Sequence, residues 1–169
     1  SLYKSKSGER GIFNRKSAQK TVSLIKDERR DSSYEFGTNP CSEIILRDRE
    51  FCNLSEVVAK ENDTLESLKK KVRVATIIGT WQSTLTDFRY LSTEWKKNCE
   101  EERLLGVSIT GIMDCNILNG NKKSIDNLPS VLEELKNVAI QTNKEWAGRL
   151  GVNPSTAITC VKPSGTVSQ

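Results

Sequence analysis

Histidine is missing from this sequence of 169 residues, which removes the commonest general base and the commonest metal ligand of proteins. The five cysteines include no Cys-x-x-Cys pair, so we expect neither a metal site nor a structural disulfide framework. No apolar run approaches the roughly 20 residues that a membrane-spanning helix needs, and the N-terminal SLYKSKSGER lacks the apolar core of a signal peptide. We therefore expect a cytoplasmic protein without a membrane partner, whose chemistry uses thiol, carboxylate, hydroxyl and backbone groups.

A strongly basic stripe is also missing. The net charge is only +4, and the Lys and Arg residues are scattered among acidic ones, so no nucleic-acid partner is predicted. A hydrophobic fraction of 36% and a charged fraction of 28% are ordinary for globular proteins and exclude wholesale disorder. Because this length suits a single core, residues 1–169 are interpreted as one domain.

Helical periodicity dominates the middle and the end of the chain. Apolar residues recur at helical spacing over about 64–87 and 129–150, and a charged helix is predicted over 93–102. A capping box beginning at Asp63 precedes the first helix, and Gly151 follows the last one as a left-handed cap. Strands that alternate with these helices indicate an α/β layer or barrel. Further predictions are strand-like segments at 44–46, 51–54, 104–109 and 157–161, a short helix ending at Leu118 and a faint helical pattern over 16–30.

The stretch GTNPCSEIILRDREFCNLSEV, residues 37–57, places polar groups in an apolar segment that is predicted to be extended. In extended chain Cys41 and Glu43 point to the same face, and Asn39 shares that face if the turn at Pro40 does not rotate it away. A thiol, a carboxylate and an amide then converge on one small ligand. The carboxylate suits a general base, the amide a hydrogen bond to a hydroxyl, and the thiol a donor of a proton, an electron or a hydrogen atom.

A second cysteine of this stretch, Cys52, follows the charged residues 47–50. These charged residues are predicted to form a hairpin bend that returns Cys52 to the side of Cys41. The alternative that stays open is that both cysteines are small hydrophobes in a buried strand, as most free cysteines are. That interpretation is adopted for the remaining three cysteines, which are Cys99, Cys115 and Cys160.

The end of the sequence, PSGTVS at residues 163–168, offers backbone N–H groups and three hydroxyls in a tight loop. Such a loop suits phosphate, although it lacks the Gly-Lys-Ser/Thr ending of a nucleotide-hydrolysing P-loop. An ordinary polar turn is the alternative.

Three ordered motifs resemble one enzyme family. Asn39-Pro-Cys41-Ser-Glu43-Ile, followed by Cys52-Asn-Leu-Ser-Glu-Val, resembles the finger loop of the ribonucleotide reductase large subunit, whose pattern is Asn-x-Cys-x-Glu with a second cysteine downstream. The spacing to Cys52 matches the adenosylcobalamin-dependent (class II) branch. The segment from Ser7 to Arg15 looks like that branch's Ser-Gly-Glu-Pro-Gly-Ile-Phe-Asn, with Arg10 where proline is usual, and residues 162–168 look like the family's substrate phosphate loop.

The resemblance implies a fold and a set of roles. The chain would be an α/β segment of the ten-stranded barrel of ribonucleotide reductases, with a central finger loop at about 37–57. Cys41 would be the thiyl radical that removes the 3′ hydrogen, Glu43 would take the proton of the 3′ hydroxyl, and Asn39 would hydrogen-bond the sugar. Cys52 would be one of two reducing cysteines, whose partner in the family lies on an N-terminal strand ahead of this sequence. The residues implied to bind substrate phosphates are Ser164, Gly165, Thr166, Val167 and Ser168.

The resemblance also implies partners. They are a ribonucleoside di- or triphosphate, adenosylcobalamin and a thioredoxin-like reductant for the complete enzyme, although cobalamin binding by this segment is not expected. Because only a middle portion of the family's length is covered, we expect the isolated chain to be inactive and to associate with complementary reductase segments or with itself. The alternatives are a segment of a class I large subunit, which receives its radical from a separate metalloprotein, and a non-catalytic α/β interaction module.

Overall fold

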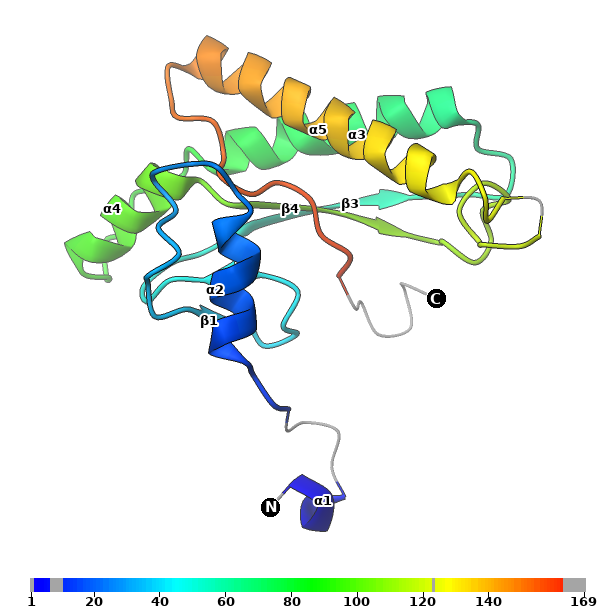
Figure 1. The fold of residues 1–169 in the computed structure, drawn as a ribbon. Coiled ribbons are helices and arrows are strands. Elements are labelled where there is room, and N and C mark those ends of the chain that lie inside the picture. The colour runs from blue at the N-terminus through cyan, green and yellow to red at the C-terminus, as the bar shows by residue number, and fades with distance from the viewer. Residues whose placement is uncertain (1, 7–10, 123, 163–169) are drawn as a thin grey trace.

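The protein is described by a computed structural model over residues 2–6, 11–122 and 124–162. Its centre is a parallel strand pair with two long helices (Figure 1). The elements are α1 (Leu2–Ser5), α2 (Arg15–Ser23), β1 (Gly37–Thr38), β2 (Ile45–Leu46), β3 (Asn53–Val58), α3 (Leu65–Gln82), α4 (Thr93–Glu102), β4 (Leu105–Thr110) and α5 (Leu128–Leu150).

The central sheet is parallel and follows chain order. β3 pairs with β4 in a register that runs from Asn53↔Leu105 to Val58↔Thr110, and a parallel bridge joins Val107 to Thr159 on the other side of β4. Figure 1 shows α3 and α5 on the same side of these strands. Parallel strands in chain order with covering helices define an α/β architecture, so that prediction is confirmed, whereas the closed ten-stranded barrel stays a prediction.

The core lies between the sheet and the two helices. Every second residue of β4 points toward the helices, because successive side chains of a strand alternate between its faces. Burying these apolar faces against one another supplies the main favourable contribution to folding. Fully or nearly fully buried members of this core are Val57, Leu68, Val72, Leu105, Val107, Leu135 and Ala139.

The start of α3 differs from the prediction by one residue. Thr64, not Asp63, is the N-cap: its hydroxyl accepts from the Ser67 N–H at 3.2 Å, while the Ser67 hydroxyl accepts from the Thr64 N–H at 2.9 Å. Asp63 instead accepts from the Ser67 hydroxyl at 2.7 Å and pairs with Lys71 at 2.5 Å. The helix ends at Gln82, earlier than predicted, where Ser83 forms its C-cap.

The helices α4 and α5 fit their predictions closely, whereas α2 ends at Ser23, before the end of the faint pattern predicted over 16–30. α4 has the predicted bounds, and α5 carries Pro129 in its first turn and the left-handed Gly151 (φ 67°) at its C-cap. Two predictions are wrong. Turns replace the short helix before Leu118, after the left-handed Gly111 (φ 72°), and the predicted strand at 157–161 makes only the one bridge to β4 because the chain leaves the sheet after Thr159.

Over the described ranges, none of the helices combines the length and apolar character required to cross a lipid bilayer.

Candidate functional site

The motif residues at 39–44 form the loop of the small β1–β2 hairpin. Asn39 closes this loop, because its side-chain oxygen accepts from the Ile44 N–H at 3.0 Å and its backbone carbonyl accepts from the Ser42 N–H at 3.0 Å. Ser42 is in the left-handed region at φ 64°. The expectation that Cys41 and Glu43 share one face of an extended strand is therefore wrong: both lie in a folded turn.

Within this loop the functional groups differ in exposure. Cys41 is exposed, whereas Asn39 and Glu43 are half-buried. Both carboxylate oxygens of Glu43 are buried and have no hydrogen-bond partner among the described residues. Leaving a buried carboxylate without a partner is costly, so this group is available to accept a proton or a hydrogen bond from a ligand.

Cys52 lies directly before β3 and is half-buried. Burial raises the pKa of its thiol, and the negative charge of Glu43 raises it further. The two groups are thus close enough to interact. The predicted hairpin that would bring Cys52 beside Cys41 does not form in the described part of the chain: a turn does occur at 48–49, but β2 pairs with β1 and β3 pairs with β4.

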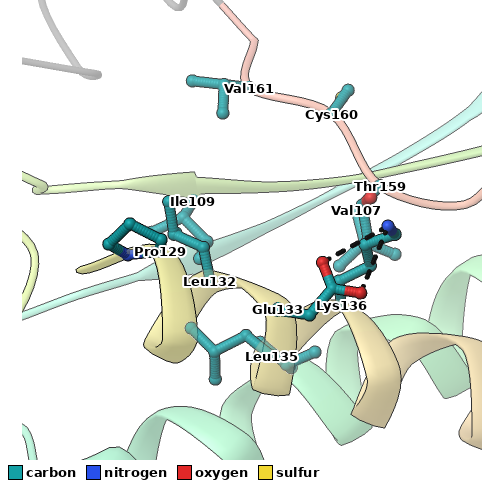
Figure 2. Close-up of a pocket in the computed structure, with 11 residues that line it drawn as sticks. Val107, Ile109, Pro129, Leu132, Glu133, Leu135, Lys136, Thr159, Cys160 and Val161 are labelled. Carbon is teal, nitrogen blue, oxygen red and sulfur yellow. Dashed lines mark hydrogen bonds and ion pairs between the residues drawn. The ribbon is translucent and has the colours of Figure 1, made fainter. Parts of the chain in front are cut away.

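A third thiol, that of Cys160, joins this region, and the sequence analysis missed it. Burial and then the charges of Glu43 and Cys52 raise the pKa of Cys160 to about 11. Figure 2 shows the Cys160 side chain extending away from α5, on the side of the sheet that the helices leave uncovered. No local sequence pattern predicts this position of Cys160, because Cys160 reaches the site through the pairing of its segment with β4.

Side chains from three other parts of the chain pack against Gly106 of β4. A Cβ atom at Gly106 would lie 3.2 Å from the Cys160 Sγ and 3.2 Å from the Ile44 Cδ1, and closer than 3.0 Å to the Leu54 Cδ2. Ile44 follows Glu43 in the loop, and Leu54 lies on β3. The glycine therefore lets three chain segments pack closely on one spot of the sheet.

A buried ionic network anchors the chain after the loop. Arg30 pairs with Glu102 and donates to the Ile45 carbonyl at 2.6 Å, and the Arg47 Nε lies 2.8 Å from the Glu102 Oε1. Glu50 accepts from the Arg47 N–H at 2.8 Å. Burial and the nearby charge of Glu102 raise the pKa of Glu50 to about 8. Residues 47–50, predicted to form a hairpin bend, thus fix the position of the loop against α4.

An apolar pocket of about 390 Å³ lies between α5 and the strands (Figure 2). Leu132 and Leu135 line it from α5, Val107 lines it from β4, and Cys160 also lines it, so the pocket borders the site. Among the described residues, no group of three or more cysteine, aspartate or glutamate side chains is arranged to hold a metal ion.

Two predicted segments lie outside the described residues. They are the phosphate loop residues Ser164, Gly165, Thr166, Val167 and Ser168, and the first four residues, 7–10, of the motif that runs from Ser7 to Arg15. The described chain leads toward the first of them at Lys162, whose N–H donates to the Ser108 hydroxyl at 2.9 Å. Ser108 is the residue of β4 two positions after Gly106, so it lies on the same face as the thiols.

The chain is similar over most of its length to adenosylcobalamin-dependent ribonucleoside-triphosphate reductases. It is 30% identical to the protein of Lactobacillus acidophilus over 79% of this chain and 20% of that protein. It is 26% identical to the protein of Lacticaseibacillus paracasei over 97% of this chain and 25% of that protein, and 31% identical to the protein of Euglena gracilis over 78% of this chain and 17% of that protein.

The chain thus spans about a fifth to a quarter of the length of the curated relatives it matches. No family model and no solved structure matches it. The similarity relates the chain to oxidoreductases of the ribonucleotide reductase family and supports its interpretation as a segment of a class II enzyme.

Proposed function

We propose that this chain is a catalytic segment of a class II ribonucleotide reductase, which converts ribonucleotides to 2′-deoxyribonucleotides by thiyl-radical chemistry. The observation that carries the proposal is the single loop at 39–44, which holds a thiol, an amide and a carboxylate whose buried oxygens have no partner among the described residues. The relatives' names support it, and their reference to adenosylcobalamin favours class II over a class I segment.

Cys41 is the residue assigned to hydrogen abstraction. As a thiyl radical, its sulfur takes the hydrogen atom from the substrate's 3′ carbon and becomes a thiol, which leaves the unpaired electron on that carbon. The exposure of Cys41 on the loop supports this role, because the sulfur can meet a sugar that approaches from outside the chain.

Glu43 and Asn39 are assigned to the sugar hydroxyls. Glu43 accepts the proton of the 3′ hydroxyl, a role that fits a buried carboxylate whose oxygens have no described partner. Asn39 uses its side-chain oxygen to close the loop, so its Nδ2–H group is the part assigned to hydrogen-bond the substrate as the 2′ hydroxyl leaves as water. Asn39 therefore has both a structural and a binding role.

Cys52 is assigned to reduction. It supplies one of two thiols that end as a disulfide when the substrate is reduced, and a thioredoxin-like protein restores the thiols in the complete enzyme. The substrate is proposed to be a ribonucleoside triphosphate, in keeping with the relatives' names. Residues Ser164, Gly165, Thr166, Val167 and Ser168 are assigned to its phosphates.

Adenosylcobalamin does not fit four hollows that the described residues form. These four measure about 330 to 530 Å³, a size suited to drug-sized ligands and too small to enclose a corrinoid with its nucleotide. The cofactor is therefore assigned to other parts of the complete enzyme, and the steps above concern only this chain's own residues.

A partner segment is proposed along the outer flank of β3 and α3. Val58, Val74, Ile78 and Trp81 are each more than half exposed there, and the three helical residues form one stripe. A further strand and helix of a complementary reductase segment would cover this flank. The isolated chain, which leaves it open, is expected to show no nucleotide reduction.

A chimera tests the proposal. This chain replaces the aligned segment of the Lactobacillus acidophilus relative, and reduction of ribonucleoside triphosphates is measured with adenosylcobalamin and a dithiol. The chimera is expected to turn over, and the Cys41→Ser and Glu43→Gln variants are expected to lose at least about a hundredfold of that rate, the usual contribution of a positioned catalytic group.

Ser42→Ala is the matched control, because Ser42 is exposed in the same loop and its hydroxyl makes a long, exposed contact of 3.4 Å with the Thr38 hydroxyl. It is expected to retain the rate. Full activity of the Cys41→Ser chimera, or turnover by the isolated chain, would overturn the proposal.

A further inference from the structure

The hairpin that carries the 39–44 loop is held at its base by a buried arginine. Thr38 of β1 pairs with Ile45 of β2 where the loop begins and ends. The Arg30 side chain, which is only 2% exposed, donates from its Nη2 to the Ile45 carbonyl at 2.6 Å. This contact therefore fixes the point from which the loop projects.

Arg30 also contacts α4 and the start of the hairpin. Its Nη1 pairs with Glu102, whose side chain is completely buried at the end of α4. Its guanidinium lies over the Phe36 ring, with the Cζ atom 5.3 Å from the ring centroid. Phe36 directly precedes β1 and packs with the buried Val22 of α2. One side chain thus links both sides of the hairpin to α4.

The shape of the guanidinium allows these contacts to be made together. Arginine presents its donors in a rigid planar fork and stacks on aromatic faces, whereas the lysine ammonium is a compact point charge. A lysine in place of Arg30 would keep the charge that pairs with Glu102. It would lose the planar group that lies on Phe36 while a second donor reaches the Ile45 carbonyl.

We propose that Arg30 is a positioning residue of the 39–44 loop, which holds the buried Glu43 carboxylate on the Cys52 side of the hairpin. The reaction step that this serves rests on the proposed function of Glu43. The position itself can be measured without nucleotide turnover, so failure of this proposal is distinguishable from failure of the proposed function.

The surroundings of Glu43 support this role. Ile44, the next residue, and Leu54, two residues after Cys52, both pack at Gly106, so the end of the loop and the Cys52 segment meet at one place. Burial, and then the charge of Glu43, raise the pKa of the Cys52 thiol. A hairpin that moved away from α4 would carry the Glu43 charge away from that thiol.

The first readout is the alkylation rate of Cys52 in the full 169-residue chain, measured at a series of pH values by mass spectrometry. Because the thiolate is the reactive form, the pH midpoint of this rate reports the pKa of the thiol. Glu43→Gln is expected to move the midpoint to lower pH, since it removes a negative charge that raises the pKa. In an Arg30→Lys background, Glu43→Gln is expected to leave the midpoint almost unmoved.

Arg103→Lys is the matched control. Arg103 is also buried, but it donates to the carbonyl of Ser83, which is the C-cap of α3 and not part of the hairpin. This background is expected to keep the full shift caused by Glu43→Gln, which separates positioning from a general loss of stability. Circular dichroism checks that each variant is folded. If Arg30→Lys does not fold, Phe36→Leu replaces it, because it removes the ring under the guanidinium and keeps an apolar side chain.

The second readout is turnover by the chimera with the Lactobacillus acidophilus relative. Arg30→Lys is expected to lower kcat by about ten- to a hundredfold, as misplacement of a catalytic group does, with KM nearly unchanged. Arg103→Lys is expected to change neither. An inactive parent chimera would count against the proposed function, and the alkylation readout would then decide this proposal.

Three results would overturn the proposal. They are a midpoint that Glu43→Gln does not move in the wild-type chain, a shift of equal size in the wild-type and Arg30→Lys chains, and an unchanged kcat in an active Arg30→Lys chimera.

Discussion

Gly106→Ala is the substitution to which the site is expected to be most sensitive. The new methyl group would lie closer than 3.0 Å to the Leu54 Cδ2 and 3.2 Å from both the Ile44 Cδ1 and the Cys160 Sγ. Overpacking a dense core typically costs about 1–3 kcal/mol. Alanine returns about 0.5–1 kcal/mol by restricting the unfolded chain. The net expected loss of unfolding free energy is therefore about 0–2.5 kcal/mol.

Urea unfolding followed by circular dichroism measures this loss, and Gly148→Ala is its matched control. Gly148 lies in α5 and would place its methyl group in open space, with no heavy atom within 4 Å apart from its chain neighbours and the nearby backbone of its own helix. That variant is expected to gain about 0.5–1 kcal/mol, because alanine favours a helix more than glycine does. The two glycine substitutions should therefore shift stability in opposite directions.

A double-mutant cycle assigns the loss to the crowded contact. Leu54→Ala removes the nearest obstacle, so Gly106→Ala should cost at least about 1 kcal/mol less in that background than in the wild-type chain. A Gly106→Ala variant as stable as Gly148→Ala, or a cycle without coupling, would refute the view that three segments pack on this glycine.

Three further predictions concern stability. The pKa of Glu50 is raised to about 8, so the contribution of its protonated form to stability is present below about pH 4.5 and is lost as pH rises through 8. The wild-type chain should thus lose unfolding free energy relative to Glu50→Gln between pH 5 and pH 8. A constant difference would contradict this. The Lys71 and Ser67 hydrogen bonds lower the pKa of Asp63 to about 2, so Asp63→Asn should cost about 0.5–1.5 kcal/mol at pH 7 in urea unfolding, with the difference shrinking as pH falls toward 2; an unchanged midpoint would contradict it. Gly111→Ala should lower the thermal midpoint more than Gly148→Ala does, because Gly111 has φ 72° and its Cβ would lie closer than 3.0 Å to the Ala59 carbonyl; equal midpoints would contradict it.

The helices were predictable because their signals are local. The apolar spacing in α5, Pro129 in its first turn and Gly151 at its end all act within one element, and the predicted bounds agree with the structure. The capping box of α3 was displaced by one residue because Asp63 and Thr64 are both good N-cap residues. The hydrogen bond from the Ser67 backbone N–H distinguishes them, because Thr64 accepts it, whereas Asp63 accepts from the Ser67 hydroxyl.

The shape of the motif loop was not predictable from alternation. An extended strand was expected at 41–43, but the side chain of Asn39 bonds to the backbone of Ile44 and Ser42 takes a left-handed conformation, and neither leaves a periodic signal. In the hairpin loop the Cys41 side chain is therefore exposed, whereas Glu43 is half-buried with both carboxylate oxygens buried.

The remaining features of the site depend on contacts between distant residues. Cys160 reaches the site through its pairing with β4, and Glu102 reaches Arg30 and Arg47 from α4. The charged residues 47–50 were predicted to form a hairpin bend. Their buried ion pairs were not predicted, because burial of a charged residue depends on partners that single-sequence patterns do not reveal. The position of Cys160 and the buried ionic network thus depend on the tertiary fold.

The most direct test of the central claim is an isotope measurement on the chimera with the Lactobacillus acidophilus relative. The substrate is a ribonucleoside triphosphate deuterated at its 3′ carbon, compared with the unlabelled form. If Cys41 removes that hydrogen, turnover should be slower with deuterium, and Cys41→Ser should abolish turnover with both substrates while Ser42→Ala preserves the isotope effect. Nucleotide reduction by the Cys41→Ser chimera at the unmodified rate would contradict the assignment of this loop as the catalytic centre.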